Sequence, residues 1–116
     1  MKGKLKIFVV CSYALSSSLL VEKMEEISKE KNLPIESRFV SPEKLKENLE
    51  ECDVVLLSPQ VRFSKSIFQE LLEPLGVPVI DIPMQVYGLV DAEKAIELAK
   101  ESVKKMQGKE KKREKI

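Results

Sequence analysis

The chain has 116 residues, of which 43% are hydrophobic and 34% are charged, enough for one domain with a buried core. Its formal net charge is +1, and the basic excess lies in residues 107–116, so we expect no nucleic-acid binding. With no histidine, only two cysteines and no CxxC, we expect no zinc site built on Cys and His, and Ser-His-Asp catalysis is excluded. We therefore expect no metal and no cofactor, and the low cysteine count indicates a reducing location. Because the apolar run near the N-terminus is too short for a signal peptide or a membrane span, we expect the chain in the cytoplasm.

The first strand is predicted at residues 7–10, a continuous apolar run typical of a strand buried on both faces. A helix follows and ends before Pro34, because the residue that precedes a proline disfavours helical geometry. Residues 35–40 predict a second, more polar strand at a sheet edge. The apolar stripe of the first helix consists of Leu20, Met24 and Ile27.

The second helix is predicted to start at Ser41-Pro42, with the serine as N-cap and the proline in the first helical position. Residues 53–58 are the most hydrophobic strand and are therefore expected at the centre of the sheet. A loop is predicted at residues 59–63, after that strand. The expected buried stripe of the second helix is Leu45, Leu49 and Cys52.

A third helix precedes a fourth strand at residues 77–82, where the proline near the strand start suits an edge. Residues 83–88 predict a loop, and Asp91 is the expected cap of a last helix that ends at Gly108. The third helix has the apolar stripe Phe68, Leu71, Leu72 and Leu75. The last helix has the apolar positions Ala92, Ala95, Ile96, Ala99, Val103 and Met106.

This alternation predicts an α/β three-layer sandwich, in which helices cover both faces of a four-stranded parallel sheet of order 2-1-3-4. Residues 1–106 form the expected domain, and residues 107–116 form a charged tail that we expect to be disordered. In this strand order the switch point lies between the first and third strands. Ligands bind at the carboxyl ends of the strands at such a point.

Cys11 stands at that point, directly after the first strand and before a hydroxyl-rich segment that leads into a helix. The free N–H groups and the positive dipole end of a helix favour a thiolate and an adjacent anion. We therefore predict that a phosphoryl group sits on this sulfur. The predicted phosphate-binding loop consists of Ser12, Tyr13, Ala14, Leu15, Ser16, Ser17 and Ser18, with Ser16 or Ser17 as the helix N-cap.

Three further residues are candidate contacts of the site or of a partner: Gln60, Arg62 and Tyr87. Tyr87-Gly88 fits either a wall of the site or a simple turn in which the glycine supplies positive φ. Cys52 is predicted to be a core residue. A cysteine phosphatase would need an arginine six residues after the nucleophile, and that position is Ser17 here.

The segment Cys11-Ser12-Tyr13-Ala14-Leu15-Ser16-Ser17-Ser18-Leu19-Leu20-Val21 resembles the signature Cys-Ser-Ala-Gly-Met-Ser-Thr-Ser-Leu-Leu-Val of the lactose/cellobiose enzyme IIB components of the bacterial phosphotransferase system (PTS). Residues 53–60 resemble the family's Asp-Val-Val-Leu-Leu-Gly-Pro-Gln, with Ser58 in place of glycine. Residues 87–92 resemble its Tyr-Gly-x-x-Asp-Gly segment. The resemblance extends to about Met106.

This resemblance implies a phosphocarrier. Cys11 would accept a phosphoryl group from a histidine of a IIA protein and pass it to a sugar, such as a β-linked disaccharide, bound by the membrane permease IIC. The chain would then be a cytoplasmic monomer that docks transiently at the membrane. Because Tyr13 and Ala14 depart from the family pattern, a regulatory or degenerate IIB-like binding domain without carrier activity is the alternative. A single-thiol redox protein is a third, less supported reading, since no resolving cysteine accompanies Cys11.

Overall fold

The computed structural model describes residues 4–11, 14–48 and 51–115, except for the side chains of residues 14–17 and 107–115. Four parallel strands form one sheet in the order β2-β1-β3-β4, which confirms the predicted topology. The strands are β1 (Leu5–Val10), β2 (Ile35–Val40), β3 (Val54–Leu57) and β4 (Val79–Asp81). In the central pair, β3 is apolar throughout and β1 is apolar and buried from Ile7 onward, whereas β2 and β4 are the edges, as their composition predicts.

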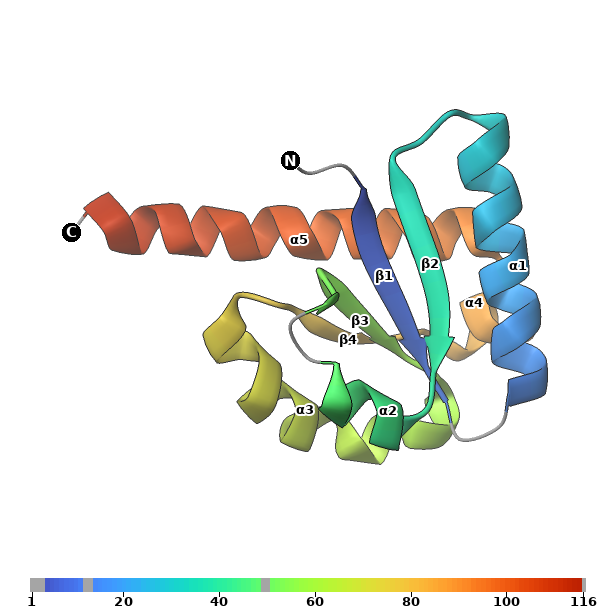
Figure 1. Cartoon of the computed structure of the whole chain (residues 1–116), viewed down its shortest axis with the longest axis horizontal. Helices are drawn as coiled ribbons and strands as arrows, with labels where there is room; N and C mark the ends of the chain where they lie inside the picture. The colour runs from blue at the N-terminus through green and yellow to red at the C-terminus, as the bar shows by residue number, and fades with distance from the viewer. Residues whose placement is uncertain (1–3, 12–13, 49–50, 116) are drawn as a thin grey trace.

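Helices cover both faces of this sheet, so the predicted three-layer α/β sandwich is confirmed (Figure 1). One face carries α1 (Ala14–Glu30), α4 (Met84–Gly88) and α5 (Ala92–Lys115). The other carries α2 (Pro42–Glu47), the 3-10 helix η2 (Pro59–Ser64) and α3 (Lys65–Leu72), which leads into the short 3-10 helix η3 (Glu73–Leu75). Within the described residues, no helix has the length and apolarity needed to cross a bilayer.

The side chains of β1 divide between the two hydrophobic cores. Ile7 and Val9 are buried under α1 and α5, while Phe8 and Val10 are buried under α2 and α3. This division follows from the strand itself, because successive side chains point to opposite faces. Because β1 is buried on both faces, its register is fixed. This register sets the position of Cys11, which follows the strand.

The register aligns the carboxyl ends of three strands. Val10 of β1 pairs with Val40 of β2 on one side and with Leu57 of β3 on the other. The Cys11 N–H then donates to the Val40 carbonyl at 3.3 Å, and the Ser58 N–H donates to the Val10 carbonyl at 3.0 Å. Cys11, at the end of β1, therefore lies at the switch point between β1 and β3, as predicted for a doubly wound sheet.

Two of the predicted helix caps are present. The Ser41 Oγ accepts from the Lys44 N–H at 3.2 Å at the start of α2, where Pro42 takes the first helical position. The Asp91 Oδ1 accepts from the Lys94 N–H at 3.2 Å at the start of α5. Both caps satisfy N–H groups that a helix leaves without an intrahelical partner.

Several element boundaries differ from the sequence-based expectations. Helix α1 already begins at Ala14, so Ser16 and Ser17 lie in its first turn and neither is its N-cap. Helix α2 ends at Glu47, and Cys52 is buried beyond it, just before β3. Leu49 lies outside the described residues. Residue 59 starts a 3-10 helix where a loop was expected, because Pro59 after the extended Ser58 supplies an N1 proline.

Further corrections concern the second half of the chain. Leu71 and Leu75 are 39% and 49% exposed, because α3 buries only the face that carries Phe68 and Leu72. The segment predicted as a loop at residues 83–88 contains α4, preceded by Pro83. Gly88 ends that helix without positive φ.

Helix α5 does not end at Gly108 but continues to Lys115, and Figure 1 shows it projecting past the sheet. Gly108 is followed by Lys109 and Glu110, which favour helix and offer no apolar contact for a Schellman stop. The separation of the domain from a charged tail at residue 106 stays a prediction.

Candidate functional site

Cys11 lies directly behind β1 and is 0% exposed. The strand pattern places its side chain on the same face as Ile7 and Val9, toward α1 and α4. The predicted position at the carboxyl end of the sheet is therefore observed, together with a burial that the sequence did not reveal. A reagent or a partner must displace a covering group before it can reach the sulfur.

Two side chains from distant parts of the chain contact this sulfur. Cys11 Sγ donates to Gln60 Oε1 at 3.7 Å, and it lies 3.6 Å from Tyr87 Oη. Gln60 comes from η2 and is exposed, whereas Tyr87 comes from α4 and is 9% exposed. The structure thus brings two of the three candidate contacts to the thiol. Of these two contacts, Gln60 is exposed to solvent and Tyr87 is buried.

The predicted phosphate-binding loop is shorter than expected, because α1 starts three residues after Cys11. Ser12 and Tyr13 lie outside the described residues. The backbone of Ala14, Leu15, Ser16 and Ser17 forms the first turn of α1, and Ser18 is exposed. The first four N–H groups of a helix have no intrahelical acceptor, so this turn offers donors and a positive dipole end to an anion.

Ala14 has helical backbone geometry and is not among the described non-glycine residues with positive φ, which are Asn32 and Val90. A glycine is therefore not required at this position, and the change from the family pattern carries no cost in backbone strain here. This weakens the argument from Ala14 for a IIB-like binding domain without carrier activity.

Arg62 and Cys52 do not join the site. Arg62 is exposed on η2, and in the described part of the chain no bond links it to the sulfur. Its contact with a phosphate or a partner stays a prediction. Cys52 is 4% exposed in the core beneath α2 and α3. Burial, with the negative charges of Asp53 and Glu51, raises the pKa of its thiol to about 11, so it stays protonated at neutral pH.

Sequence reasoning places Ser58 at the same edge of the sheet as Cys11 but does not name it as a candidate contact of the thiol. It follows β3 and is 0% exposed, and the structure gives its Oγ no hydrogen-bond partner among the described residues. The available signal was its place in the family-like segment at residues 53–60, where it replaces a glycine. Because glycine has no side chain, the serine adds a hydroxyl directly after a central strand. This chemical change therefore lies at the site rather than in the core.

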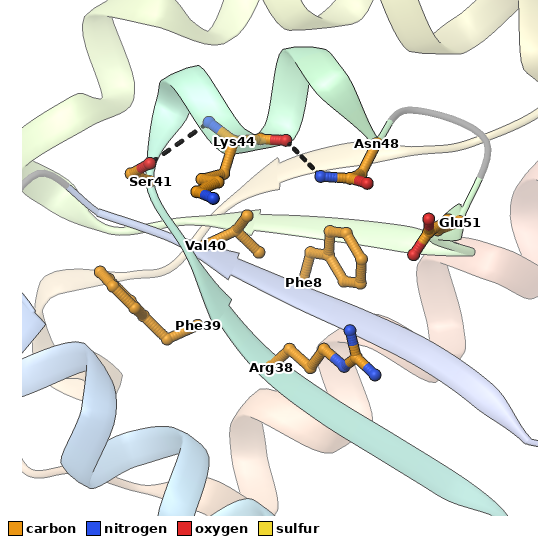
Figure 2. A pocket seen from close by; sticks show the side chains of 8 residues that line it. All are labelled: Phe8, Arg38, Phe39, Val40, Ser41, Lys44, Asn48 and Glu51. Atoms are coloured by element: carbon orange, nitrogen blue, oxygen red, sulfur yellow. Dashed lines mark hydrogen bonds between the residues drawn. The ribbon is translucent and has the colours of Figure 1, made fainter.

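A separate pocket of about 420 Å³ lies between the edge strand β2 and α2 (Figure 2). Phe8 and Val40 form its apolar floor, and Lys44 and Arg38 supply positive charge near Glu51. Phe8 and Val40 belong to the core on the α2 face, whereas Cys11 faces the opposite side. This pocket is therefore not part of the thiol site.

The fold and the site together define a class: a small doubly wound α/β protein with a cysteine at the sheet switch point, placed before a helix N-terminus. Comparison with known proteins makes this specific. Residues 6–98 match the family model described as the lactose/cellobiose-specific IIB subunit of the PTS system. The chain belongs to this family and is a IIB component of a sugar-specific phosphotransferase system.

Curated relatives agree with this assignment. The chain is 38% identical over 94 residues to the PTS oligo-beta-mannoside-specific EIIB component of Bacillus subtilis, a match that covers 81% of this chain and 91% of that one. It is 34% identical over 98 residues to the galactose-specific EIIB component of Lactococcus lactis subsp. cremoris, with 80% and 91% covered. The named sugars differ between these relatives.

Solved structures show the same fold. The cellobiose-specific phosphotransferase IIB component from Borrelia burgdorferi superposes with a TM-score of 0.75 at 33% identity, covering 91% of this chain and 97% of that one. The lactose-specific IIB domain from Streptococcus pneumoniae gives a TM-score of 0.77 at 20% identity, with 85% and 97% covered. The second likeness bears on the fold alone.

Proposed function

We propose that this chain is the phosphocarrier of a sugar-importing phosphotransferase system and that Cys11 carries the phosphoryl group. The observation that supports this most directly is the position of Cys11 between the end of β1 and the first turn of α1. The N–H groups of that turn favour both a thiolate and the dianion of a phosphocysteine. The chain has no histidine, so the donor imidazole belongs to a partner.

The proposed cycle has two transfers. The Cys11 thiolate attacks the phosphorus of a phosphohistidine on IIA, so an S–P bond forms while the N–P bond breaks and its electron pair returns to the imidazole. A hydroxyl oxygen of the sugar bound by IIC then attacks the same phosphorus. The S–P bond breaks, sulfur leaves as a thiolate, and the hydroxyl proton passes to a base at the sugar site or to water.

Exposed apolar side chains surround the carboxyl end of the sheet, where such partners must dock. Phe63 on η2 is 79% exposed, Met84 on α4 is 68% exposed and Leu19 on α1 is 45% exposed. Figure 1 shows η2 and the start of α1 flanking the end of β1. Exposed apolar residues of this size near a site are typical of transient protein interfaces. This role places the chain on the cytoplasmic side, transiently at the membrane through IIC.

The test is phosphorylation by a phosphorylated IIA from the same source, followed by mass spectrometry of the Cys11 peptide. We expect one phosphoryl group on Cys11, and none on Cys11→Ala. Cys52→Ala is the matched control, because it removes the other buried thiol and should be phosphorylated like the wild type. A wild-type chain that no such IIA phosphorylates would contradict the carrier role.

A second candidate function is a IIB-like binding domain without carrier activity. One observation favours it: Cys11 is 0% exposed, whereas a carrier must present its sulfur to two partners in turn. Cys11→Ser distinguishes the two functions in cells that lack the chromosomal gene. Restoration of sugar uptake by this variant would favour the binding role, and loss of uptake would favour the carrier.

A further inference from the structure

The cycle above gives no role to the hydroxyl of Ser58. Ser58 is fully buried, and its Oγ has no hydrogen-bond partner among the described residues. It occupies the N-cap position of η2, yet its side chain makes no capping bond. Buried hydroxyls without a partner are rare and costly, so a group that supplies the missing bond in another state of the site is expected.

The register shows which group lies beside it. Val10 pairs with Leu57, and the Ser58 N–H donates to the Val10 carbonyl, so the ladder continues to place Cys11 next to Ser58. Leu56 and Val9 belong to the core under α1 and α5, and side chains two positions further along point to the same face. Cys11 and Ser58 are therefore same-face neighbours on adjacent strand ends, at the separation where side-chain pairs interact.

We propose that the Ser58 hydroxyl donates a hydrogen bond to Cys11 Sγ when that thiol is ionised, and thereby keeps the sulfur nucleophilic between transfers. This inference rests on the proposed function in one respect, that Cys11 is the transferring sulfur. In the protonated state Cys11 Sγ donates to Gln60 Oε1. On ionisation its proton leaves to water, and the sulfur becomes an acceptor for Ser58 Oγ–H and Tyr87 Oη–H.

The family segment that residues 53–60 resemble has glycine at the position of Ser58, and glycine has no side chain to donate. The other groups around the thiol do not change with Ser58: Tyr87 of α4 contacts the sulfur, Arg62 of η2 is exposed, and Asp81 at the end of β4 pairs with Lys65. A change in the pKa of the Cys11 thiol after substitution of Ser58 can therefore be attributed to the loss of the Ser58 hydroxyl.

The experiment measures the rate of alkylation of Cys11 by iodoacetamide against pH, with the modified peptide identified by mass spectrometry so that Cys52 is scored separately. Ser58→Ala and Ser58→Gly both remove the hydroxyl, and each should raise the apparent pKa of the Cys11 thiol by about one unit, equivalent to about tenfold less thiolate below that pKa. The two variants differ in backbone freedom, so an effect common to both belongs to the hydroxyl.

Ser37→Ala is the matched control. Ser37 is the other described residue with a buried, unpartnered Oγ, but it pairs with Ile7, four residues and about 13 Å along β1 from Cys11. It should leave the alkylation profile of Cys11 unchanged. An unchanged apparent pKa in Ser58→Ala and Ser58→Gly, or an equal shift in Ser37→Ala, would overturn the inference.

The same readout separates this inference from the proposed function, because alkylation needs no phosphoryl donor. If IIA phosphorylates Cys11 in every variant at the wild-type rate and the apparent pKa does not move, only the role of Ser58 is lost. If the pKa shifts as expected but Cys11 never accepts a phosphoryl group, the role of Ser58 in thiol ionisation stands and the carrier assignment fails.

Discussion

Cys11 Sγ lies 3.6 Å from Tyr87 Oη, although 76 positions separate the two residues in the chain. The tyrosine reaches the sulfur because α4 follows β4 directly and turns Tyr87 into the core that β1 shares with α1 and α5. The end of β1 and a short helix that follows the far edge strand therefore come into contact at the sulfur of Cys11. The contact is buried, so a hydrogen bond from the Tyr87 hydroxyl to an ionised Cys11 sulfur is stronger than it would be in water.

Tyr87→Phe removes the hydroxyl and keeps the ring in place. Because a phenolic O–H stabilises an adjacent thiolate, we expect the rate constant for alkylation of Cys11 near neutral pH to fall about tenfold, equivalent to about 1.4 kcal/mol. The free energy of unfolding should change by only about 1 kcal/mol. Peptide-resolved alkylation and urea unfolding measure the two effects.

The neighbouring Val86→Ala is the control for Tyr87. Val86 is buried in the same core, so its truncation should lower the free energy of unfolding by about 2 kcal/mol. Its side chain has no polar atom that could bond the thiol, so the alkylation rate should stay near the wild-type value. If both variants slow alkylation equally, the tyrosine acts through packing alone and its hydroxyl has no effect on the thiol.

Gln60 is the exposed side chain that contacts the sulfur of Cys11. Gln60→Ala removes an exposed side chain that contacts the sulfur, so alkylation of Cys11 should become faster while stability changes by less than about 0.5 kcal/mol. Gln60→Glu has nearly the same shape but adds a negative charge, which raises the pKa of an adjacent thiol and repels a phosphoryl group. It should slow both alkylation and transfer from IIA. Equal rates in these two variants would show that Gln60 does not cover the sulfur.

The fold was predictable because the strands carry a strong local signal. Residues 7–10 and 54–57 are continuous apolar runs that have no other stable place than the centre of a parallel sheet. Ser41 and Asp91 are predicted helix caps, and in the structure each side chain accepts a hydrogen bond from a backbone N–H of the helix that it precedes. The strand order then follows from short right-handed connections.

The site was predictable only in part, because its contacts are long-range. The position of Cys11 follows from local sequence, but its side-chain contacts come from η2 and α4, two short helices that have no side-chain capping bond at their starts. Leu71 and Leu75 fit a helical stripe, yet α3 is too short and too peripheral to bury that whole face. Ser58 gave no periodic signal, since a single hydroxyl after a strand resembles an ordinary loop residue.

Cys52 makes stability depend on pH above neutrality. Burial raises the pKa of its thiol to about 11, whereas a thiol in the unfolded chain titrates near 8.5. Between these values the folded state holds a proton that the unfolded state has released, so the free energy of unfolding falls as pH rises, at up to about 1.4 kcal/mol per pH unit. Below about pH 8 the contribution is complete.

The variant that tests this is Cys52→Ala, measured by urea unfolding at several pH values between 7 and 10.5. It should be about 1 to 2 kcal/mol less stable at pH 7, because it leaves a small cavity in the core. The difference from the wild type should shrink as pH rises, since the variant has no thiol to ionise. A difference that stays constant across this range would mean that Cys52 ionises alike in both states.

Phe63 offers a test of where partners dock. It is 79% exposed on η2, three residues after Gln60, so Phe63→Ser should leave the free energy of unfolding within about 0.5 kcal/mol of the wild type. If IIA approaches Cys11 across this side chain, the KM for phosphorylated IIA should rise about tenfold, while kcat and direct alkylation of Cys11 stay unchanged. Leu75→Ser is the matched control, because Leu75 is also exposed but lies in η3, at the other end of α3. An equal rise in KM for the two variants would point to a general loss of surface apolarity, and no rise for Phe63→Ser would place the docking surface on α1 and α4 instead.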